Sequence, residues 1–300
     1  MSREKKEIIT GLDMKDIFEI GEMAKEKRRY FDIGMQPIGD NIFKLIRKEN
    51  IYLIYSAIQV DEKRENNFSA IYVSLKEGSE ELDFIGLNTA DYFDKQIFAL
   101  AHELYHHFNK TQLHFCRLSD EDHNITELKA NRFAAEFLLP TDRLENEIRE
   151  VNNGDKKLTD WKASAILRLI ARLHCEYRLP YKAIVRRLQE IESIDKEQYE
   201  LMLKEPVRDI DCNYYSIGCG VNKEMFEMLN KKTYKTGVDG NDLEKVIRNY
   251  EDDLISISEL VEALNIFEKK IEDFGLGEEV DMEDIEELSE YFERAEEYEA

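Results

Sequence analysis

Several residue types and patterns are scarce in this chain of 300 residues. Only 4 prolines are present while 36% of the residues are charged, a composition that favours a helix-rich, soluble protein. No stretch approaches the roughly 18 consecutive apolar residues that indicate a transmembrane helix. Residues 1–7 lack the apolar core of a secretory signal peptide. Together these absences predict a cytoplasmic protein that does not enter a membrane.

Cysteine is also scarce, and its spacing gives no sign of a disulfide framework. The 4 cysteines are Cys116, Cys175, Cys212 and Cys219. They show no C-x-x-C spacing and are too few for a dense set of cross-links. We therefore expect free thiols, as in a reducing cytoplasm.

Positive charge is in short supply overall, yet it is concentrated in one segment. The chain holds 42 Lys and Arg against 65 Asp and Glu, a net charge of −23. Residues 271–300 contain fourteen acidic residues against Arg294 alone, a net charge of −13. Residues 156–187 contain nine basic residues against Asp160 and Glu176, a net charge of +7. The overall charge argues against general nucleic-acid binding, but residues 156–187 leave a local basic face open.

The most informative stretch is residues 98–108, which contain the H-E-x-x-H pattern His102-Glu103-Leu104-Tyr105-His106. On an α-helix each residue turns by about 100°, so His102 and His106 lie one turn apart on the same face. Both can offer a ring nitrogen to one Zn²⁺ at roughly 2.0–2.1 Å. Glu103 adjoins the first ligand and can act as general base on a metal-bound water. The simpler alternative is a surface helix that carries two histidines.

A third ligand is expected in the helix predicted over residues 124–140, which has an apolar stripe along one side. Glu127 and Asn131 are i,i+4 neighbours on another face. A carboxylate at Glu127 would complete a His₂Glu set with one position open for water, an arrangement of catalytic rather than closed structural sites. Asn131 could then hydrogen-bond a ligating imidazole. The alternative for Glu127 is a solvated helix residue.

These motifs carry a resemblance to a known family. His102-Glu103-x-x-His106, followed by Glu127-x-x-Ala130-Asn131-x-Phe133-Ala134-Ala135-Glu136 and a Leu-Leu-Pro ending at Pro140, resembles the ImmA/IrrE family of metallo-endopeptidases. The resemblance covers residues 12–140 well and residues 141–205 more loosely, and it does not reach residues 206–300. It implies a helix-rich, zincin-like core.

The patterns along the chain predict an α+β fold in three parts. Residues 1–140 would form the metallopeptidase core, residues 141–205 a helical subdomain that resembles a helix-turn-helix, and residues 206–300 an acidic helical C-terminal region. A small three-stranded sheet is expected from strands at residues 51–58, 69–75 and 82–87. In the last part, residues 211–220 are predicted as a loop, with helices at residues 222–231, 241–250, 255–271 and 281–298.

The resemblance implies a zinc-dependent endopeptidase, and the His₂Glu set predicts one Zn²⁺ per chain. It also implies a narrow substrate, a helix-turn-helix transcriptional repressor of a mobile element or stress response, which cleavage would inactivate. The reaction needs a further group that stabilises the oxyanion. The sequence does not choose among the candidates, which are Tyr105, His123, His174 and Tyr181.

Two alternatives to a peptidase remain. One is a non-proteolytic, metal-containing regulatory protein that binds a repressor or DNA, against which the intact Glu103 argues. The other is a regulator that contacts DNA through residues 156–187, the less favoured of the two. Residues 281–298, with an apolar face at Ile285, Leu288 and Phe292, are either a solvated helix or an acidic tail that docks on residues 156–187.

Overall fold

The computed structural model of the chain describes residues 11–59, 68–77, 80–110, 114–117, 125–239 and 242–276. The chain divides into two units, residues 1–240 and residues 241–300. The domain boundaries predicted near residues 140 and 205 both fall inside the first unit, and the three-part division stays a prediction. His123 and the acidic tail at residues 281–298 lie outside the described residues.

The first unit combines one mixed sheet with helices that precede and follow its central strands in the sequence. The N-terminal helices are α1 (Met14–Tyr30), the 3-10 turn η1 (Gly39–Asn41) and α2 (Ile42–Lys48). The helices after the central strands are α3 (Phe93–Phe108), α4 (Ile125–Leu138), α5 (Thr141–Val151), α6 (Ala163–Tyr177), α7 (Tyr181–Glu190), α8 (Lys196–Leu203) and α9 (Asn213–Leu229). The predicted helix-rich α+β fold is thereby confirmed.

The sheet has the strand order β4-β2-β3-β1-β5. Its strands are β1 (Ile51–Ser56), β2 (Phe68–Glu77), β3 (Glu80–Asn88), β4 (His114–Arg117) and β5 (Gly237–Asp239). The pairing of β1 with β3 is parallel, and the other pairings are antiparallel. The three predicted strands are present, but the predicted three-stranded sheet is too small. At 4 and 3 residues, β4 and β5 are too short to leave an alternating pattern in the sequence.

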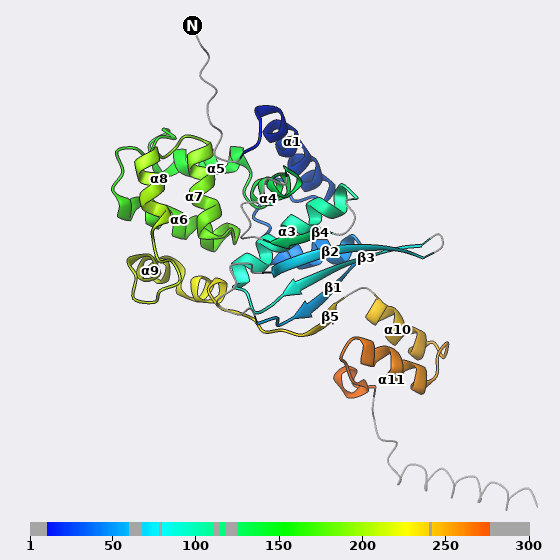
Figure 1. The fold of residues 1–300 in the computed structure, drawn as a ribbon. Coiled ribbons are helices and arrows are strands. Elements are labelled where there is room, and N and C mark those ends of the chain that lie inside the picture. The colour runs from blue at the N-terminus through cyan, green and yellow to red at the C-terminus, as the bar shows by residue number, and fades with distance from the viewer. Residues whose placement is uncertain are drawn as a thin grey trace, which may run out of the picture. The chain divides into compact units, whose positions relative to one another are not determined.

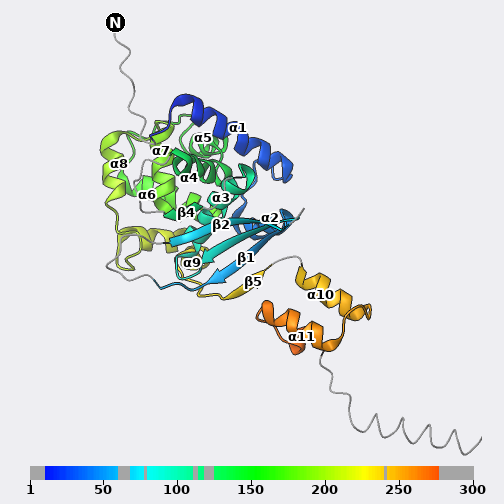
Figure 2. The ribbon, with the colours of Figure 1, turned by 45° about the vertical axis from the view of Figure 1, so that its right-hand side comes forward.

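One face of the sheet is covered by α3 and α2 (Figure 1 and Figure 2). Ile51, Leu53 and Tyr55 of β1 are buried and alternate with less buried neighbours, as expected for a strand with one covered face. Helix α4 packs on α3, and α1 packs on α4. Because α3 lies between the sheet and α4, residues 97–107 are all buried.

Two helices joined by a tight turn follow, as the sequence predicted. Helix α6 ends at Arg178, which adopts a left-handed conformation with φ of 54°, and Pro180 precedes α7. The Arg178 guanidinium donates hydrogen bonds to the carbonyls of Cys175 and Glu176, two of the acceptors left open at the end of α6. Among the described helices, none is both long enough and apolar enough to cross a membrane.

The loop predicted at residues 211–220 is wrong, because α9 already begins at Asn213. Cys212, one of three free cysteines described, caps this helix by accepting a hydrogen bond from the Tyr215 amide. Tyr214 is fully buried, and its hydroxyl lies 3.1 Å from His174 Nδ1. Tertiary packing of Tyr214 thus overrides the weak helix propensity of a Gly- and Cys-rich stretch.

Gly218 in α9 is required by close packing. A Cβ added there would lie 2.2–2.4 Å from three ring atoms of the buried Phe226. We expect Gly218→Ala to lower the free energy of unfolding by about 1–3 kcal/mol, through overpacking. Gly220→Ala is the matched control, because an added Cβ meets no atom within 4 Å. The control should stabilise slightly, by about 0.5–1 kcal/mol. Urea unfolding compares the two, and equal stabilities would contradict the packing account.

The second unit is a small helical cluster. It contains α10 (Asp242–Glu251), α11 (Ile257–Ile266) and the 3-10 turn η2 (Ile271–Phe274). The side chains of Ile247, Leu260 and Leu264 form its core. Ser256 and Glu259 make a capping box that defines the start of α11.

Candidate metal centre

Helix α3 is held at its N-terminus by a buried ionic cluster. Arg208 donates to both carboxylate oxygens of Asp94 at 2.7 Å, and His174 Nε2 lies 3.2 Å from the same carboxylate. Burial alone would raise the pKa of Asp94, but His174 and Arg208 outweigh it and hold that pKa below its ordinary value. A charged carboxylate in the first turn also suits the helix dipole. These contacts fix the start of the helix that carries the H-E-x-x-H pattern.

The motif residues are enclosed by the core. His102, Glu103 and His106 are 1%, 0% and 0% exposed, respectively. Leu100 and Leu104 are fully buried and anchor the helix in the core. The alternative of a surface helix with two histidines is therefore wrong. Polar side chains that are this deeply buried require partners within the protein or a bound ion.

Helix α4 brings Glu127 to the two histidines. The ring of Phe133 lies 5.7 Å from that of Tyr105 and 6.2 Å from that of Phe108, which joins α4 to α3. Ala130 is fully buried and adds little bulk, so the helices can approach closely. Glu127 lies in the first turn of α4 with 22% of its side chain exposed. Its placement beside α3 rules out a fully solvated residue.

The side chains of His102, His106 and Glu127 converge on one point. His102 Nε2 lies 3.2 Å from His106 Nε2 and 3.2 Å from Glu127 Oε2, and His106 Nε2 lies 3.4 Å from Glu127 Oε1. A tetrahedral ion with ligand distances of roughly 2.0–2.1 Å would place its ligand atoms about 3.3–3.4 Å apart. The donor set therefore fits a tetrahedral divalent cation. In the described part of the chain, no other group of three or more His, Cys, Asp and Glu side chains has its ligand atoms all within 4.8 Å of one another.

Asn131 lies where it can orient one of the histidines. Its Oδ1 is 3.1 Å from His102 Nδ1. An amide oxygen only accepts, so this contact selects the tautomer with hydrogen on Nδ1. The lone pair of His102 Nε2 then points to the convergence point, as a metal ligand requires. This geometry agrees with the predicted role of Asn131.

The charges around His102 favour a cation. Burial would lower the pKa of His102, but the hydrogen bond to Glu127 and the charges of Glu103 and Glu127 outweigh it, so the pKa is raised. In physical terms, the site has a negative potential that a proton or a metal ion can satisfy. A divalent ion would satisfy both imidazoles and the carboxylate at once.

Glu103 is the motif residue that is not a member of the convergent set. Its charge acts on His102, and its carboxylate is completely buried beside the three convergent side chains. A carboxylate in this position can accept a proton from a water at the site without occupying a ligand position. The site therefore offers three side chains suited to holding a cation and a separate carboxylate suited to accepting a proton.

The four candidates for oxyanion stabilisation have different surroundings. The imidazole of His174 lies between Asp94 and the hydroxyl of Tyr214, and the hydroxyl of Tyr181 donates to the Met202 carbonyl. We assign His174 and Tyr181 to the core, because these contacts occupy their polar atoms. Burial raises the pKa of Tyr105, which keeps its phenol protonated and able to donate. Tyr105 stays a prediction, as does His123, which lies outside the described residues.

His107 supports the site from the opposite side of α3. Its Nδ1 lies 3.0 Å from Asp83 of β3, and its Nε2 lies 3.3 Å from Glu49. The hydroxyl of Tyr72 donates to the same Asp83 carboxylate at 2.8 Å. The motif helix is thereby attached to the sheet through polar contacts that the sequence did not reveal.

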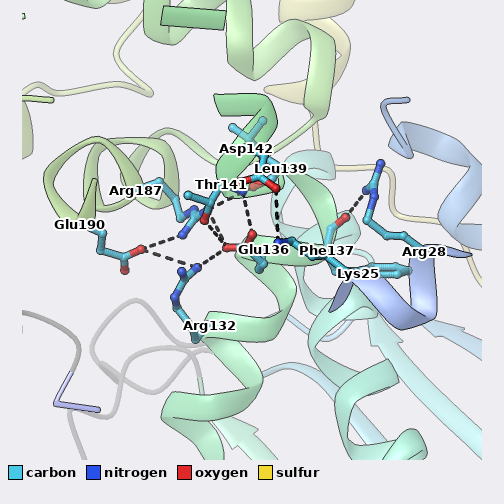
Figure 3. Close-up of polar contacts among 10 residues, drawn as sticks. All are labelled: Lys25, Arg28, Arg132, Glu136, Phe137, Leu139, Thr141, Asp142, Arg187 and Glu190. Carbon is cyan, nitrogen blue, oxygen red and sulfur yellow. Dashed lines mark hydrogen bonds and ion pairs between the residues drawn. The ribbon is translucent and has the colours of Figure 1, made fainter. Parts of the chain in front are cut away.

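A buried ionic network holds the end of α4, as Figure 3 shows. Glu136 accepts from the backbone amide of Thr141 at 2.7 Å, at the start of α5, and from the Thr141 hydroxyl. Arg132 and Arg187 lie 2.9 Å and 2.7 Å from the Glu136 carboxylate, and Arg187 also donates to Glu190. The network joins α4, α5 and α7, and so fixes the helix that presents Glu127.

This network should be visible in the pH dependence of stability. Burial would raise the pKa of Glu136, but Arg187, Arg132 and Thr141 together lower it from 4.5 to about 2. The ionised carboxylate therefore stabilises the fold above pH 4.5, and this contribution is lost as the pH falls towards 2. Between about pH 5 and pH 3 the stability gap between wild type and Glu136→Gln should narrow by about 2 kcal/mol. Urea unfolding at both pH values measures the gap, and a constant gap would contradict the assignment.

A comparison with protein families gives a match whose range covers this site. Residues 62–189 match the family model Peptidase_M78, described as an IrrE N-terminal-like domain. The matched range contains all three convergent side chains, Glu103 and Asn131, and it ends in α7. No curated protein sequence shows significant similarity to the chain.

Proposed function

We propose that the chain is a zinc-dependent endopeptidase of the ImmA/IrrE type, a proposal supported by the match of residues 62–189 to the IrrE N-terminal-like family model. The observation that carries the proposal is the convergence of His102, His106 and Glu127 within 3.2–3.4 Å beside the buried Glu103. Two neutral imidazoles and a carboxylate are a ligand set typical of catalytic zinc, although Mn²⁺ and Fe²⁺ accept the same donors. The residues that the structure describes contain one convergent set, which supports one ion per chain.

The chain's own residues divide the chemistry between them. When bound, Zn²⁺ would supply a Lewis acid that polarises the scissile carbonyl and acidifies water. Glu103 accepts a proton from the attacking water as its oxygen bonds to the carbonyl carbon. It then delivers that proton to the leaving nitrogen as the C–N bond breaks, which regenerates the carboxylate. Asn131 holds the His102 ring in orientation throughout. A donor such as Tyr105 would stabilise the negative oxygen.

We further propose that the substrate is a helix-turn-helix transcriptional repressor in the cytoplasm. Support comes from the ImmA/IrrE resemblance of the motifs and from the helical region α5–α8, which is large enough to dock a folded partner beside the core. DNA contact through residues 156–187 is less favoured. Arg187 is buried in the Glu136 network, and Arg172 is paired with Glu147 at 2.6 Å, so fewer cations are available to phosphates than the sequence suggested.

The proposal is tested by comparing protein N-termini in cells that produce either the wild-type chain or Glu103→Gln. The expected result is a small set of new N-termini in wild-type cells only, located inside a helix-turn-helix protein. Identical sets in the two cells would reject the peptidase. A Glu103-dependent N-terminus in another class of protein would keep the peptidase and reject the repressor.

A further inference from the structure

An apolar groove lies between α5, α6 and α9, in the helical region of the first unit. Its volume is about 630 Å³. Val151 at the end of α5, Leu169 of α6 and Val221 of α9 contribute to its walls, together with Trp161. Val151 and Val221 remain 45% and 40% exposed, so apolar side chains from two separate elements face water across the same groove. Exposed apolar side chains that gather in this way are characteristic of a docking surface.

Trp161 forms the aromatic wall of the groove, and its side chain is already held by a hydrogen bond in the absence of a partner. The indole Nε1 of Trp161 donates to Asn152 Oδ1 at 3.0 Å. Asn152 is itself fixed, because its side-chain amide donates to the carbonyls of Asp155 and Lys157. A side chain that is already ordered loses little conformational entropy on binding, so the indole is preorganised as an anchor.

The cations along the groove are of two kinds. Arg172 donates to the buried Glu147 and is neutralised there. Lys162 and Arg168 also line the groove, are exposed, and form no ion pair within the described ranges of the chain. The groove therefore offers an apolar floor with uncompensated positive charge beside it.

We propose that this groove binds an acidic amphipathic helix of a partner protein. The apolar side of such a helix would cover Trp161, Leu169 and Val221, while its acidic flank would meet Lys162 and Arg168. Charge complementarity selects this partner over nucleic acid, because two unpaired cations beside an apolar floor are too few for a phosphate backbone. The proposal is independent of peptide hydrolysis, since it concerns binding at a surface outside the metal centre.

Trp161 is the only tryptophan in the sequence, so the tryptophan fluorescence of the chain reports on binding at the groove. The full-length chain is titrated with a synthetic peptide of about 18 residues, with leucines spaced three and four apart and glutamate between them. We expect a saturable change in tryptophan fluorescence that weakens as salt increases. A peptide of the same composition in scrambled order tests whether the apolar face is needed, and one with lysine in place of glutamate tests the charge.

The variants localise the binding. Arg168→Glu should weaken the peptide at least tenfold, whereas Arg186→Glu, an exposed cation of α7 outside the groove, should leave the affinity unchanged within about twofold. Absence of saturable binding, or equal binding of all three peptides, would overturn the proposal. Binding that appears only after deletion of residues 277–300 would also overturn it, because the chain's own acidic tail would then be the occupant. Binding that competes with self-association of the chain would assign the groove to a second copy.

Discussion

Glu103→Gln is expected to lower the rate of peptide-bond hydrolysis by about 10²–10⁴-fold while leaving metal binding intact. The substitution keeps the size of the buried side chain and removes the basic oxygen. Glu103 lies outside the convergent ligand set, so His102, His106 and Glu127 keep their geometry. The measurement is kcat/KM on the protein that acquires a new N-terminus in wild-type cells, with purified, zinc-loaded enzyme.

Two controls make this result specific to proton transfer. The metal content of Glu103→Gln should equal that of wild type, which excludes loss of the ion as the cause. Asn131→Ala should be milder, with a loss of about 10–100-fold in metal affinity or activity, because it affects only the orientation of His102. Wild-type turnover by Glu103→Gln would remove Glu103 from the mechanism.

Glu136→Ala is expected to lower the free energy of unfolding by about 3–5 kcal/mol. The substitution leaves Arg187, which is only 1% exposed, and Arg132 with the Glu190 carboxylate alone, at 2.9 Å and 3.6 Å respectively. It also removes the acceptor for the Thr141 amide at the start of α5. Glu150→Ala is the matched control, since Glu150 is 60% exposed and lies 3.9 Å from Arg143. Such a pair contributes at most about 1 kcal/mol.

Urea unfolding measures the loss of unfolding free energy in both variants. A loss for Glu136→Ala no larger than that for Glu150→Ala would show that the network does not stabilise the fold. The network also positions Glu127 through α4, so Glu136→Ala should bind metal more weakly than wild type even under conditions where it remains folded. If Glu136→Ala keeps the metal affinity of wild type, the network stabilises the fold but does not position Glu127.

The convergence of the candidate metal ligands could be predicted because its information is local. The spacing of His102 and His106 fixes both on one helical face, and Glu127 and Asn131 repeat the same i,i+4 relation on the next helix. A short motif therefore determines most of the geometry once the two helices are known to pack together. The fold class was predictable for a similar reason, since apolar periodicity is a local pattern.

What the sequence did not reveal depends on contacts between distant residues. The helical start of α9 rests on Tyr214 packed against His174, and on Gly218 beneath Phe226. The anchoring of α3 depends on Arg208, which is far from Asp94 in the sequence. No spacing rule links residues that are so far apart in the sequence. For residues 211–220, the residue propensities alone indicated a loop.

Residues 206–239, which lie beyond the matched family range, support the motif helix, although the sequence indicates only that they belong to an acidic helical region. The Phe93 amide donates to the Lys231 carbonyl at 2.8 Å, and the side chain of Gln96 exchanges hydrogen bonds with Thr233. β5 of the same segment pairs with β1. The start of the motif helix α3 is thus held by sequence outside residues 62–189.

A calorimetric titration of the metal-free chain with Zn²⁺ tests the proposed metal site most directly. We expect one ion bound per wild-type chain, the same stoichiometry for Glu103→Gln, and loss of the tight site in both His106→Ala and Glu127→Ala. These outcomes follow from a ligand set that consists of His102, His106 and Glu127 and excludes Glu103. Failure of the wild-type chain to bind Zn²⁺, or undiminished binding by His106→Ala, would contradict it.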